Sequence, residues 1–307
     1  TVVPELDADF ARYLDWLAEG RHGDMEYLHQ NAAARADLVN VFEGVRSAVV
    51  FGQTYEPIFG HGPRVAGYAA LPDYHRTLKA KGAKILRGLQ DQVDADIEGR
   101  VVVDSAPVLE RAIAAQAGRG FIGKNTCFIH RDAGSFLLLG EILLNIPIGA
   151  PSAQPIDPAQ RTKDGGCGTC RRCQVHCPTG ALDRDFQIDA RKCLSYWTIE
   201  QRGLVPPEYW KHFAEYWYGC DVCQNVCPYN RPRVPPNAPP KKLPLLHEVA
   251  TMDQGLYERA FGGTPMTRAK RNGLRRNALI AMAVTADPHL EAVVAQLRCD
   301  ADPIIQG

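Results

Sequence analysis

The spacing of eight cysteines constrains this chain more than any other feature. They fall between positions 167 and 227, whereas the other two of the ten, Cys127 and Cys299, stand apart. The first run has the spacing C-x2-C-x2-C-x3-C-P by which bacterial ferredoxins hold iron–sulfur clusters. It comprises Cys167, Cys170, Cys173 and Cys177. Because the first three thiolates of such a run bind one cluster and the fourth binds another, a second set of cysteines is expected.

The second run supplies that set. It comprises Cys220, Cys223 and Cys227, and Cys193 lies between the two runs. The sequence therefore predicts two [4Fe–4S] clusters. Cluster one takes Cys167, Cys170, Cys173 and Cys227, and cluster two takes Cys177, Cys193, Cys220 and Cys223. Two structural zinc sites are the alternative, since they also use C-x2-C pairs, but they rarely need three cysteines in successive x2 steps. A pair of clusters forms an electron path, which predicts an electron acceptor elsewhere in the chain.

Composition narrows the class of protein. A length of 307 residues suggests two domains with a third small one, and 35 basic residues balance 35 acidic ones, which excludes a basic coat over the whole surface. The most apolar stretch, residues 136–148, is too short for a membrane span and contains Glu141 and Asn145. The first residues show neither a basic signal region nor a twin-arginine pair. We expect a cytoplasmic protein that does not contact membranes.

The first domain, residues 1–158, is expected to be α/β. Short strands are predicted at 47–51, 101–103, 127–130 and 136–144. A helix over 12–28 is expected to be interrupted at Gly20 and Gly23, and another to run from Pro107, in its first turn, to Gly118.

Two further domains are expected beyond it. Residues 159–235 contain the cysteines and lie between Pro-rich stretches at 147–158 and 228–240. Residues 236–307 have a helical pattern, with helices at 268–284 and 290–297 that resemble the start of a helical-repeat array.

The segment from Gly118 to Lys124 nearly matches two nucleotide-binding motifs, and both matches fail in context. A dinucleotide fingerprint follows a strand and begins a helix, whereas this G-x-G-x-x-G follows a predicted helix. A P-loop needs Ser or Thr after its lysine, and this chain has Asn125. We expect the glycines to shape a loop whose backbone lies close to a large ligand.

Asp104 ends a predicted strand and precedes a helix. From position alone, a helix-capping or turn role is the favoured interpretation. Beside an apolar cofactor, however, the pKa of this carboxyl would rise, and Asp104 would serve as a proton donor. The histidines, including His61 and His130, show no ligand spacing.

Two other groups have two interpretations each. The aromatic side chains between the cysteine runs either pack around the clusters or stack on a base or cofactor. They are Tyr196, Trp197, Tyr209, Trp210, Phe213, Tyr216, Trp217 and Tyr218. Arg268, Arg271 and Arg275 share one face of a predicted helix, near Lys270 and Arg276, with no acidic residue between positions 259 and 287. They form either a solvated helix face or a phosphate contact.

Several motifs taken together resemble the epoxyqueuosine reductases, the cobalamin-dependent enzymes of tRNA queuosine synthesis. They include Asp73-Tyr74-His75, Gly123-Lys124-Asn125-Thr126, Gly134-Ser135-Phe136, the Val-Asp-Ser-Ala-Pro segment at 103–107, Cys193-Leu194-Ser195-Tyr196-Trp197-Thr198-Ile199-Glu200, and Tyr218-Gly219-Cys220-Asp221-Val222-Cys223-Gln224. The match covers nearly the whole chain in order. It departs at Tyr216-Trp217, where the family commonly has Arg-Ile.

The resemblance implies a nitroreductase-like cobalamin domain, a ferredoxin-like domain with two [4Fe–4S] clusters and a HEAT-like helical tail. It implies that electrons from an external low-potential donor reach cobalamin through the clusters. It also implies that the enzyme reduces the epoxide of epoxyqueuosine in the tRNA anticodon loop, with Asp104 as the general acid. The residues that would bind cobalamin are Tyr68, Asp73, Tyr74, His75, Asp104, Lys124, Asn125, Thr126, Ser135, Phe136, Ser195 and Asp221. Those expected to contact tRNA are Gln201, Arg202, Arg268, Arg271 and Arg275. We expect a monomer.

Two other functions are compatible with these features. A reductive dehalogenase also combines cobalamin with two clusters, although such enzymes typically carry twin-arginine signals. A non-enzymatic electron carrier would use the clusters alone, but it would not need an α/β domain of about half the chain.

Overall fold

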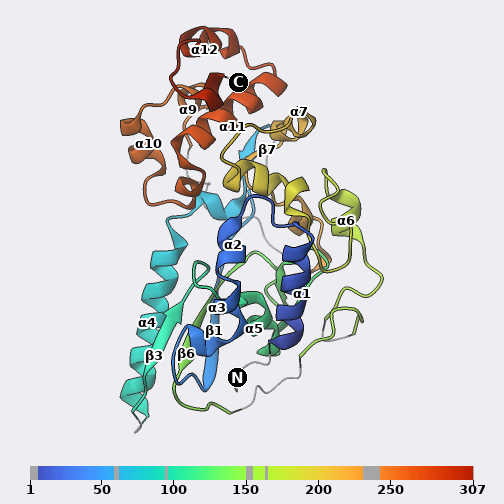
Figure 1. Ribbon diagram of the computed structural model, residues 1–307, viewed down its shortest axis with the longest axis vertical. Helices are drawn as coiled ribbons and strands as arrows, with labels where there is room; N and C mark the ends of the chain where they lie inside the picture. The colour runs from blue at the N-terminus through green and yellow to red at the C-terminus, as the bar shows by residue number, and fades with distance from the viewer. Residues whose placement is uncertain are drawn as a thin grey trace.

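The computed structural model describes residues 6–58, 62–93, 96–149, 155–162, 165–230 and 243–306. His61, most of the second Pro-rich stretch and the predicted boundary at 235 lie outside these residues. Figure 1 shows the sheet and its helices at one end of the molecule and the C-terminal helices, drawn in orange and red, at the other. No helix in the described part of the chain is both long and apolar enough to cross a membrane.

The central sheet has the order β1-β6-β3 and all its pairings are antiparallel. Its strands are β1 (Ser47–Thr54), β3 (Gly99–Val102) and β6 (Leu137–Leu144). Successive side chains of a strand point to opposite faces, so β6 contributes Ile142 to the face under α4 (Tyr74–Gln92) and Leu143 to the face under α5 (Glu110–Gln116). The predicted strands are confirmed, and the sheet lies between two helices.

The predicted helix boundaries need two adjustments. The first helix divides into α1 (Asp7–Ala18) and α2 (Glu26–Gln30), because Gly20 and Gly23 have positive φ, as their positions suggested. The prediction that Pro107 lies in a helical turn is wrong. Residues 104–108 form bends before α5, in which the Ser105 N–H donates to the carbonyl of Val103.

The middle of the glycine-rich segment is a short strand, and turns lie on both sides of it. Gly120 belongs to β4 (Gly120–Ile122), which pairs with β5 (Phe128–His130) as a hairpin. A Cβ at Gly120 would collide with the carbonyl oxygen of Ile129. Gly120 is therefore needed for its close approach to β5, and the expected approach of this segment to a large ligand stays a prediction.

The remaining elements are short, apart from the C-terminal helices. The first half also contains α3 (Ala32–Ala36), β2 (Arg64–Val65) and 3-10 turns at Leu38–Asn40 and Gly67–Ala70. The cysteine region contains α6 (Arg172–His176), α7 (Pro207–Trp210), β7 (Tyr216–Tyr218), α8 (Val222–Asn225), 3-10 turns at Ala190–Lys192, Lys211–Ala214 and Pro228–Asn230, and a π-helical turn at Tyr196–Glu200. The C-terminal part comprises α9 (Leu246–Ala250), α10 (Gln254–Phe261), a 3-10 turn at Pro265–Ala269, α11 (Lys270–Val284), α12 (Leu290–Leu297) and α13 (Pro303–Gln306).

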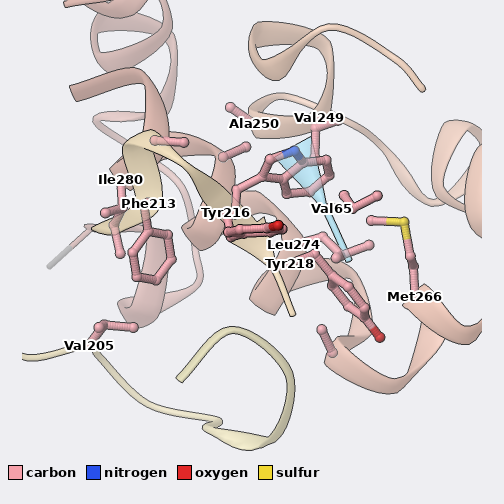
Figure 2. Close-up of a cluster of buried hydrophobic side chains, with 14 of the residues drawn as sticks. Val65, Val205, Phe213, Tyr216, Tyr218, Val249, Ala250, Met266, Leu274 and Ile280 are labelled. Atoms are coloured by element: carbon pink, nitrogen blue, oxygen red, sulfur yellow. The ribbon is translucent and has the colours of Figure 1, made fainter. Parts of the chain in front are cut away.

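The largest hydrophobic core spans all three predicted domains. Val65 from the first domain, Tyr216 and Tyr218 from the cysteine region, and Leu274 and Met266 from the C-terminal part pack together (Figure 2). Strand β7 also pairs with β2 in a parallel two-stranded sheet. The buried aromatic residues of β7 therefore serve packing. The division at 158 and 235, and the nitroreductase-like and HEAT-like assignments, stay predictions.

Helix α11 is anchored to the π-helical turn by two buried polar side chains. Arg276 donates to the carbonyl oxygens of Trp197 (2.8 Å), Gln201 (2.9 Å) and Gly203 (2.6 Å). Asn277 donates to the carbonyl of Thr198 at 2.7 Å. Burying a guanidinium is costly unless it is well hydrogen-bonded, and these carbonyls satisfy it. They also fix the segment that follows Cys193.

Candidate functional site

Asp104 lies in a strained turn directly after β3. Its φ is 42°, a left-handed value that non-glycine residues seldom adopt and that often occurs at functional sites. Its side chain is 56% exposed, and Oδ2 accepts hydrogen bonds from the hydroxyl of Tyr74 at 2.8 Å and from Nε2 of His75 at 3.1 Å. Both donors belong to the first turn of α4. The turn thus presents a carboxylate at the surface, held from one side by two side chains.

A chain of hydrogen bonds continues behind His75. Nδ1 of His75 lies 2.8 Å from Oδ1 of Asp73, and the same oxygen accepts the His75 N–H, which makes Asp73 the N-cap of α4. The hydrogen bond to Asp104, together with that to Asp73, raises the pKa of His75 although partial burial opposes this. The imidazole therefore carries its proton between two carboxylates.

The pKa of Asp104 depends on burial and on its hydrogen-bond partners. Partial burial raises it, but the hydrogen bonds from His75 and Tyr74 outweigh this effect and hold the pKa below its ordinary value. The rise in pKa expected for Asp104 beside an apolar cofactor stays a prediction, because the lowered value belongs to the protein side chains alone. The proton available at the turn belongs to the Asp104–His75 pair.

Aromatic rings connect this turn to the second cysteine set. Tyr74 contacts Tyr68 edge-on at 6.3 Å, Tyr68 contacts Tyr55 at 6.4 Å, and Tyr55 contacts Phe136 at 5.5 Å. Burial is the main reason that the pKa of Tyr55 rises, and the nearby charge of Asp221 and of Cys223 adds to it. The aromatic chain therefore extends from Asp104 to the neighbourhood of Cys223.

Asp221 lies behind these rings. It is buried and accepts the N–H of Gly67 at 2.7 Å, while Gln224 donates to its other oxygen at 3.3 Å. Burial raises the pKa of Asp221 to about 6 in spite of these bonds. Gln224 also accepts a hydrogen bond from Ser135 at 3.0 Å, so Ser135 and Asp221 belong to one polar network between the sheet domain and the cysteine region.

Other expected cofactor residues serve contacts with the cysteine region. The ammonium group of Lys124 pairs with Asp185 at 2.9 Å. The backbone N–H of Lys124 donates to the sulfur of Cys167 at 3.4 Å. Asn125 donates to the carbonyl of Cys223 at 3.4 Å. The backbone of Lys124 and the side chain of Asn125 thus connect the β4–β5 hairpin to one cysteine of each set.

Thr126 and Ser195 lie at the edges of this region. Thr126 has a φ of 63°, and its carbonyl accepts a hydrogen bond from Arg111 at 2.5 Å. Ser195 follows Cys193 by two residues, and its N–H and hydroxyl both interact with that thiol.

The structure brings together the members of the first predicted set. One cavity is lined by all four of them, with Lys124, Asn125 and Arg161 among its other walls. In the second set, burial raises the pKa of Cys193 and of Cys220, and the charge of Cys177 adds to both. A hydrogen bond with Cys127 and burial raise the pKa of Cys223, and the charges of Cys220 and Cys193 add to it. The assignment of ligands to two clusters stays a prediction.

The chemistry of these thiols suits iron. Burial raises the pKa of Cys173 to about 11 and that of Cys227 to about 12, so a cation must stabilise their thiolates at neutral pH. In a four-iron cluster, each of the four thiolates binds a different iron.

The expected basic helix face is not present. Arg268 lies in the 3-10 turn before α11 and pairs with Glu200 through two 3.0 Å hydrogen bonds. Arg275 is only 4% exposed, donates to the carbonyl of Ala250 and pairs with Asp300. Its expected contact with tRNA is therefore wrong, because its guanidinium is in the protein interior.

Arg268 is close to the Asp104 turn instead. Its positive charge helps lower the pKa of Asp104, and its guanidinium lies 5.1 Å from the ring centre of Tyr27, which is 39% exposed. Arg202 is also exposed, and Arg271 is half-buried near Asp300. Gln201 is half-buried and accepts the N–H of Arg202.

The structure adds residues that the sequence analysis missed. Tyr55 and Tyr27 join the site from segments without a recognisable motif, whereas Gln224 ends the motif at 218–224. Glu110 accepts the N–H of Asp104 at 2.9 Å. Both Glu110 and Gln224 had a local signal, since Glu110 lies six residues after Asp104 and Gln224 directly follows Cys223.

Comparisons with known proteins agree on one family. A family model described as 4Fe-4S double cluster binding domain matches residues 166–230, and one described as epoxyqueuosine reductase QueG, DUF1730, matches residues 35–105. A protein named epoxyqueuosine reductase from Xanthomonas campestris pv. campestris is 35% identical over 310 residues, which cover 96% of this chain and 84% of that protein.

Solved structures give the same result. The structure of epoxyqueuosine reductase from Streptococcus thermophilus superposes with a TM-score of 0.89 at 28% identity, covering 99% of this chain and 82% of that one. A crystal structure of an epoxyqueuosine reductase with an epoxyqueuosine-modified stem loop of a tyrosine tRNA has a TM-score of 0.86 at 26% identity, covering 100% and 82%. The fold, the two cysteine sets and these matches show that the chain belongs to the epoxyqueuosine reductase family of oxidoreductases.

Proposed function

We propose that this protein removes the epoxide oxygen of epoxyqueuosine at the wobble position of a tRNA anticodon, with two [4Fe–4S] clusters and cobalamin as cofactors. One observation carries the proposal: aromatic rings lead from the Asp104–His75–Asp73 chain to Tyr55, whose hydroxyl accepts a hydrogen bond from Gln224, the residue after Cys223. A proton source and an electron path thus approach the same place. Loss of an epoxide oxygen as water needs both, an electron pair for the carbons and protons for the oxygen.

The side chains between Asp104 and Asp221 suit a corrin. A corrin has a broad apolar face with amide groups around its edge. Aromatic side chains can pack on the face, and polar side chains can bind the amides. Tyr68 and Tyr74 offer half-buried rings, and Asp73 and Ser195 offer polar groups at the edge. We infer that these residues, with Phe136, Ser135 and Asp221 behind them, would hold cobalamin. When bound, that cofactor supplies the reducing electrons.

The residues of the turn then have separate tasks. The Asp104–His75 pair delivers a proton to the epoxide oxygen, and Asp73 orients the imidazole through Nδ1. Tyr74 donates to the same carboxylate oxygen and fixes its direction. Because Asp104 is exposed, a base that has left the anticodon stack can reach it.

The tRNA would approach over Arg268, Arg202, Gln201 and Arg271. The charge of Arg268 helps lower the pKa of Asp104, and the exposed ring of Tyr27 beside Arg268 offers a stacking surface for a base. The proposed substrate places the enzyme in the cytoplasm. An external low-potential donor would reduce the clusters, and a monomer would suffice because all named residues belong to one chain.

Deleting the gene tests the function. We expect tRNA from such cells to accumulate epoxyqueuosine and lose queuosine, and the reintroduced gene to reverse both changes. Nucleoside analysis of digested tRNA by mass spectrometry measures this directly. Unchanged queuosine, in a strain shown to lack any other such reductase, would contradict the proposal.

Replacing Arg202 and Arg268 with alanine should weaken tRNA binding. If both guanidinium groups neutralise phosphates, their loss releases fewer counterions, and the slope of log affinity against log salt should fall by up to about two units. Filter binding over a range of salt concentrations measures the slope. Arg12→Ala removes an equally exposed arginine from α1 and is the matched control. An unchanged slope in the double variant would leave both arginines as solvated surface charges.

A further inference from the structure

Glu141 is a carboxyl group enclosed by the apolar side of the sheet. It is completely buried at the centre of β6, directly opposite Val50 of β1 and Val102 of β3. Neither carboxyl oxygen has a hydrogen-bond partner among the described residues. Burial raises the pKa of Glu141 well above its ordinary value, so this side chain is a neutral acid.

Glu110, at the start of α5, is the ionisable group next to it. Its carboxyl interacts with that of Glu141 and also accepts the backbone N–H of Asp104 at 2.9 Å. Burial raises the pKa of Glu110 to about 7, although the hydrogen bond from Asp104 opposes the rise. Glu110 thus connects the sheet interior to the turn that carries the proposed proton donor.

The turn needs such support. At a φ of 42°, Asp104 has a backbone conformation that costs free energy and persists only where surrounding contacts enforce it. Tyr74 and His75 hold the side chain, but the backbone N–H of Asp104 is held by Glu110. Without this acceptor, nothing else shown in the structure would bind that N–H.

We propose that Glu110 is a positioning residue, whose carboxylate holds the backbone of Asp104 so that the Asp104 carboxyl faces the substrate. This inference rests on the proposed function, and it assigns to Glu110 a role through Asp104 rather than through contact with substrate.

The strength of the hydrogen bond from the Asp104 N–H to Glu110 should depend on pH. The charged groups that face Glu110 are Asp104 in the turn, Arg111 on α5 and His75 on α4, with neutral Glu141 below it on β6. As pH rises through about 7, Glu110 becomes a carboxylate, and a charged acceptor binds an N–H more strongly than a neutral one. The turn should be held more firmly above that pH than below it.

Hydrogen exchange in the cluster-loaded protein tests the hold without cobalamin or substrate. In Glu110→Ala, the amide hydrogens of the peptide containing Asp104 should exchange roughly tenfold faster, because about one hydrogen bond is lost. Amide hydrogens in peptides from β6 and α11 should exchange as in the parent. Glu110→Gln keeps an acceptor and should restore most of the protection. In the parent, protection corrected for intrinsic exchange should increase from about pH 6 to about pH 8, and in Glu110→Gln it should not. Glu43→Ala, an exposed site, is the control.

Single-turnover reduction of epoxyqueuosine provides the second measurement. Glu110→Ala should be roughly 10- to 100-fold slower with tRNA affinity unchanged, and Glu110→Gln should recover to within about fivefold of the parent. Unchanged exchange in Glu110→Ala, faster exchange throughout the protein, or no rescue by Glu110→Gln would each overturn the inference. A parent protein that consumes no epoxyqueuosine would refute the proposed function, and the exchange measurements would still decide the role of Glu110.

Discussion

The Asp104→Asn variant is expected to reduce epoxyqueuosine roughly 100-fold or more slowly than the parent in a single turnover, the usual contribution of a positioned acid. Asparagine keeps the size of the side chain and an oxygen that accepts the hydrogen bonds of Tyr74 and His75. It cannot pass a proton from the imidazole to the substrate. The measurement uses chemically pre-reduced enzyme, so that electron delivery does not limit the rate.

The pH dependence gives a second sign of the same role. The pKa of His75 is raised, so its proton is present below that pKa and is lost as the pH rises through it. The single-turnover rate of the parent should therefore fall at alkaline pH, at a value above the ordinary pKa of histidine, about 6.5.

Asp132→Asn is the matched control for Asp104, because it removes a carboxylate from an exposed turn after β5. It should react like the parent. If Asp104→Asn also reacts at the parent rate, another donor or a water performs the proton transfer. If it fails to bind cobalamin, Asp104 is a binding group and its role as an acid is unsupported.

The Cys193→Ala variant is expected to lose about half of the iron of the reconstituted protein, since its cluster would keep only three thiolates. Iron and sulfide analysis after anaerobic reconstitution measures the loss. Cys193 shares its surroundings with Cys177 and Cys220, whose charges both interact with it. The second cluster should therefore be lost while the first remains.

Cys299→Ala and Cys127→Ala are the controls. Cys299 is exposed near the C-terminal end of the given sequence, and the Cys299→Ala variant should retain all the iron. Cys127 lies against Cys223, but belongs to neither predicted ligand set. Full iron in Cys193→Ala, or a loss of about half in Cys127→Ala, would show that the assignment of ligands is wrong.

The cysteine sets could be predicted because cluster ligation depends on short spacings that a sequence displays directly. The strands were likewise predicted from local apolar runs. Glu141 is a residue whose role the sequence does not reveal. It interrupts an apolar stretch, which argues against a membrane span but does not indicate a buried acid. Its burial inside the sheet depends on pairing with β1 and β3, which lie far away in sequence.

The basic residues show why the rest could not be predicted. No acidic residue lies near Arg268 or Arg275 in sequence, yet both are paired in the structure. Their partners, Glu200 and Asp300, lie 68 and 25 positions away. A short stretch of sequence does not show an acidic partner that the fold brings in from a distant segment.

The anchoring of α11 has a consequence for how this protein can diverge. Among the described residues, Arg276 is bound by three backbone carbonyls, at Trp197, Gln201 and Gly203, and by the side-chain oxygen of its neighbour Asn277. When two side chains form a pair, a change in one can be balanced by a change in the other. A main-chain carbonyl has no such alternative, because every residue type presents the same group. A substitution of Arg276 therefore cannot be compensated at positions 197, 201 and 203, and arginine at 276 should outlast the side chains of those three residues.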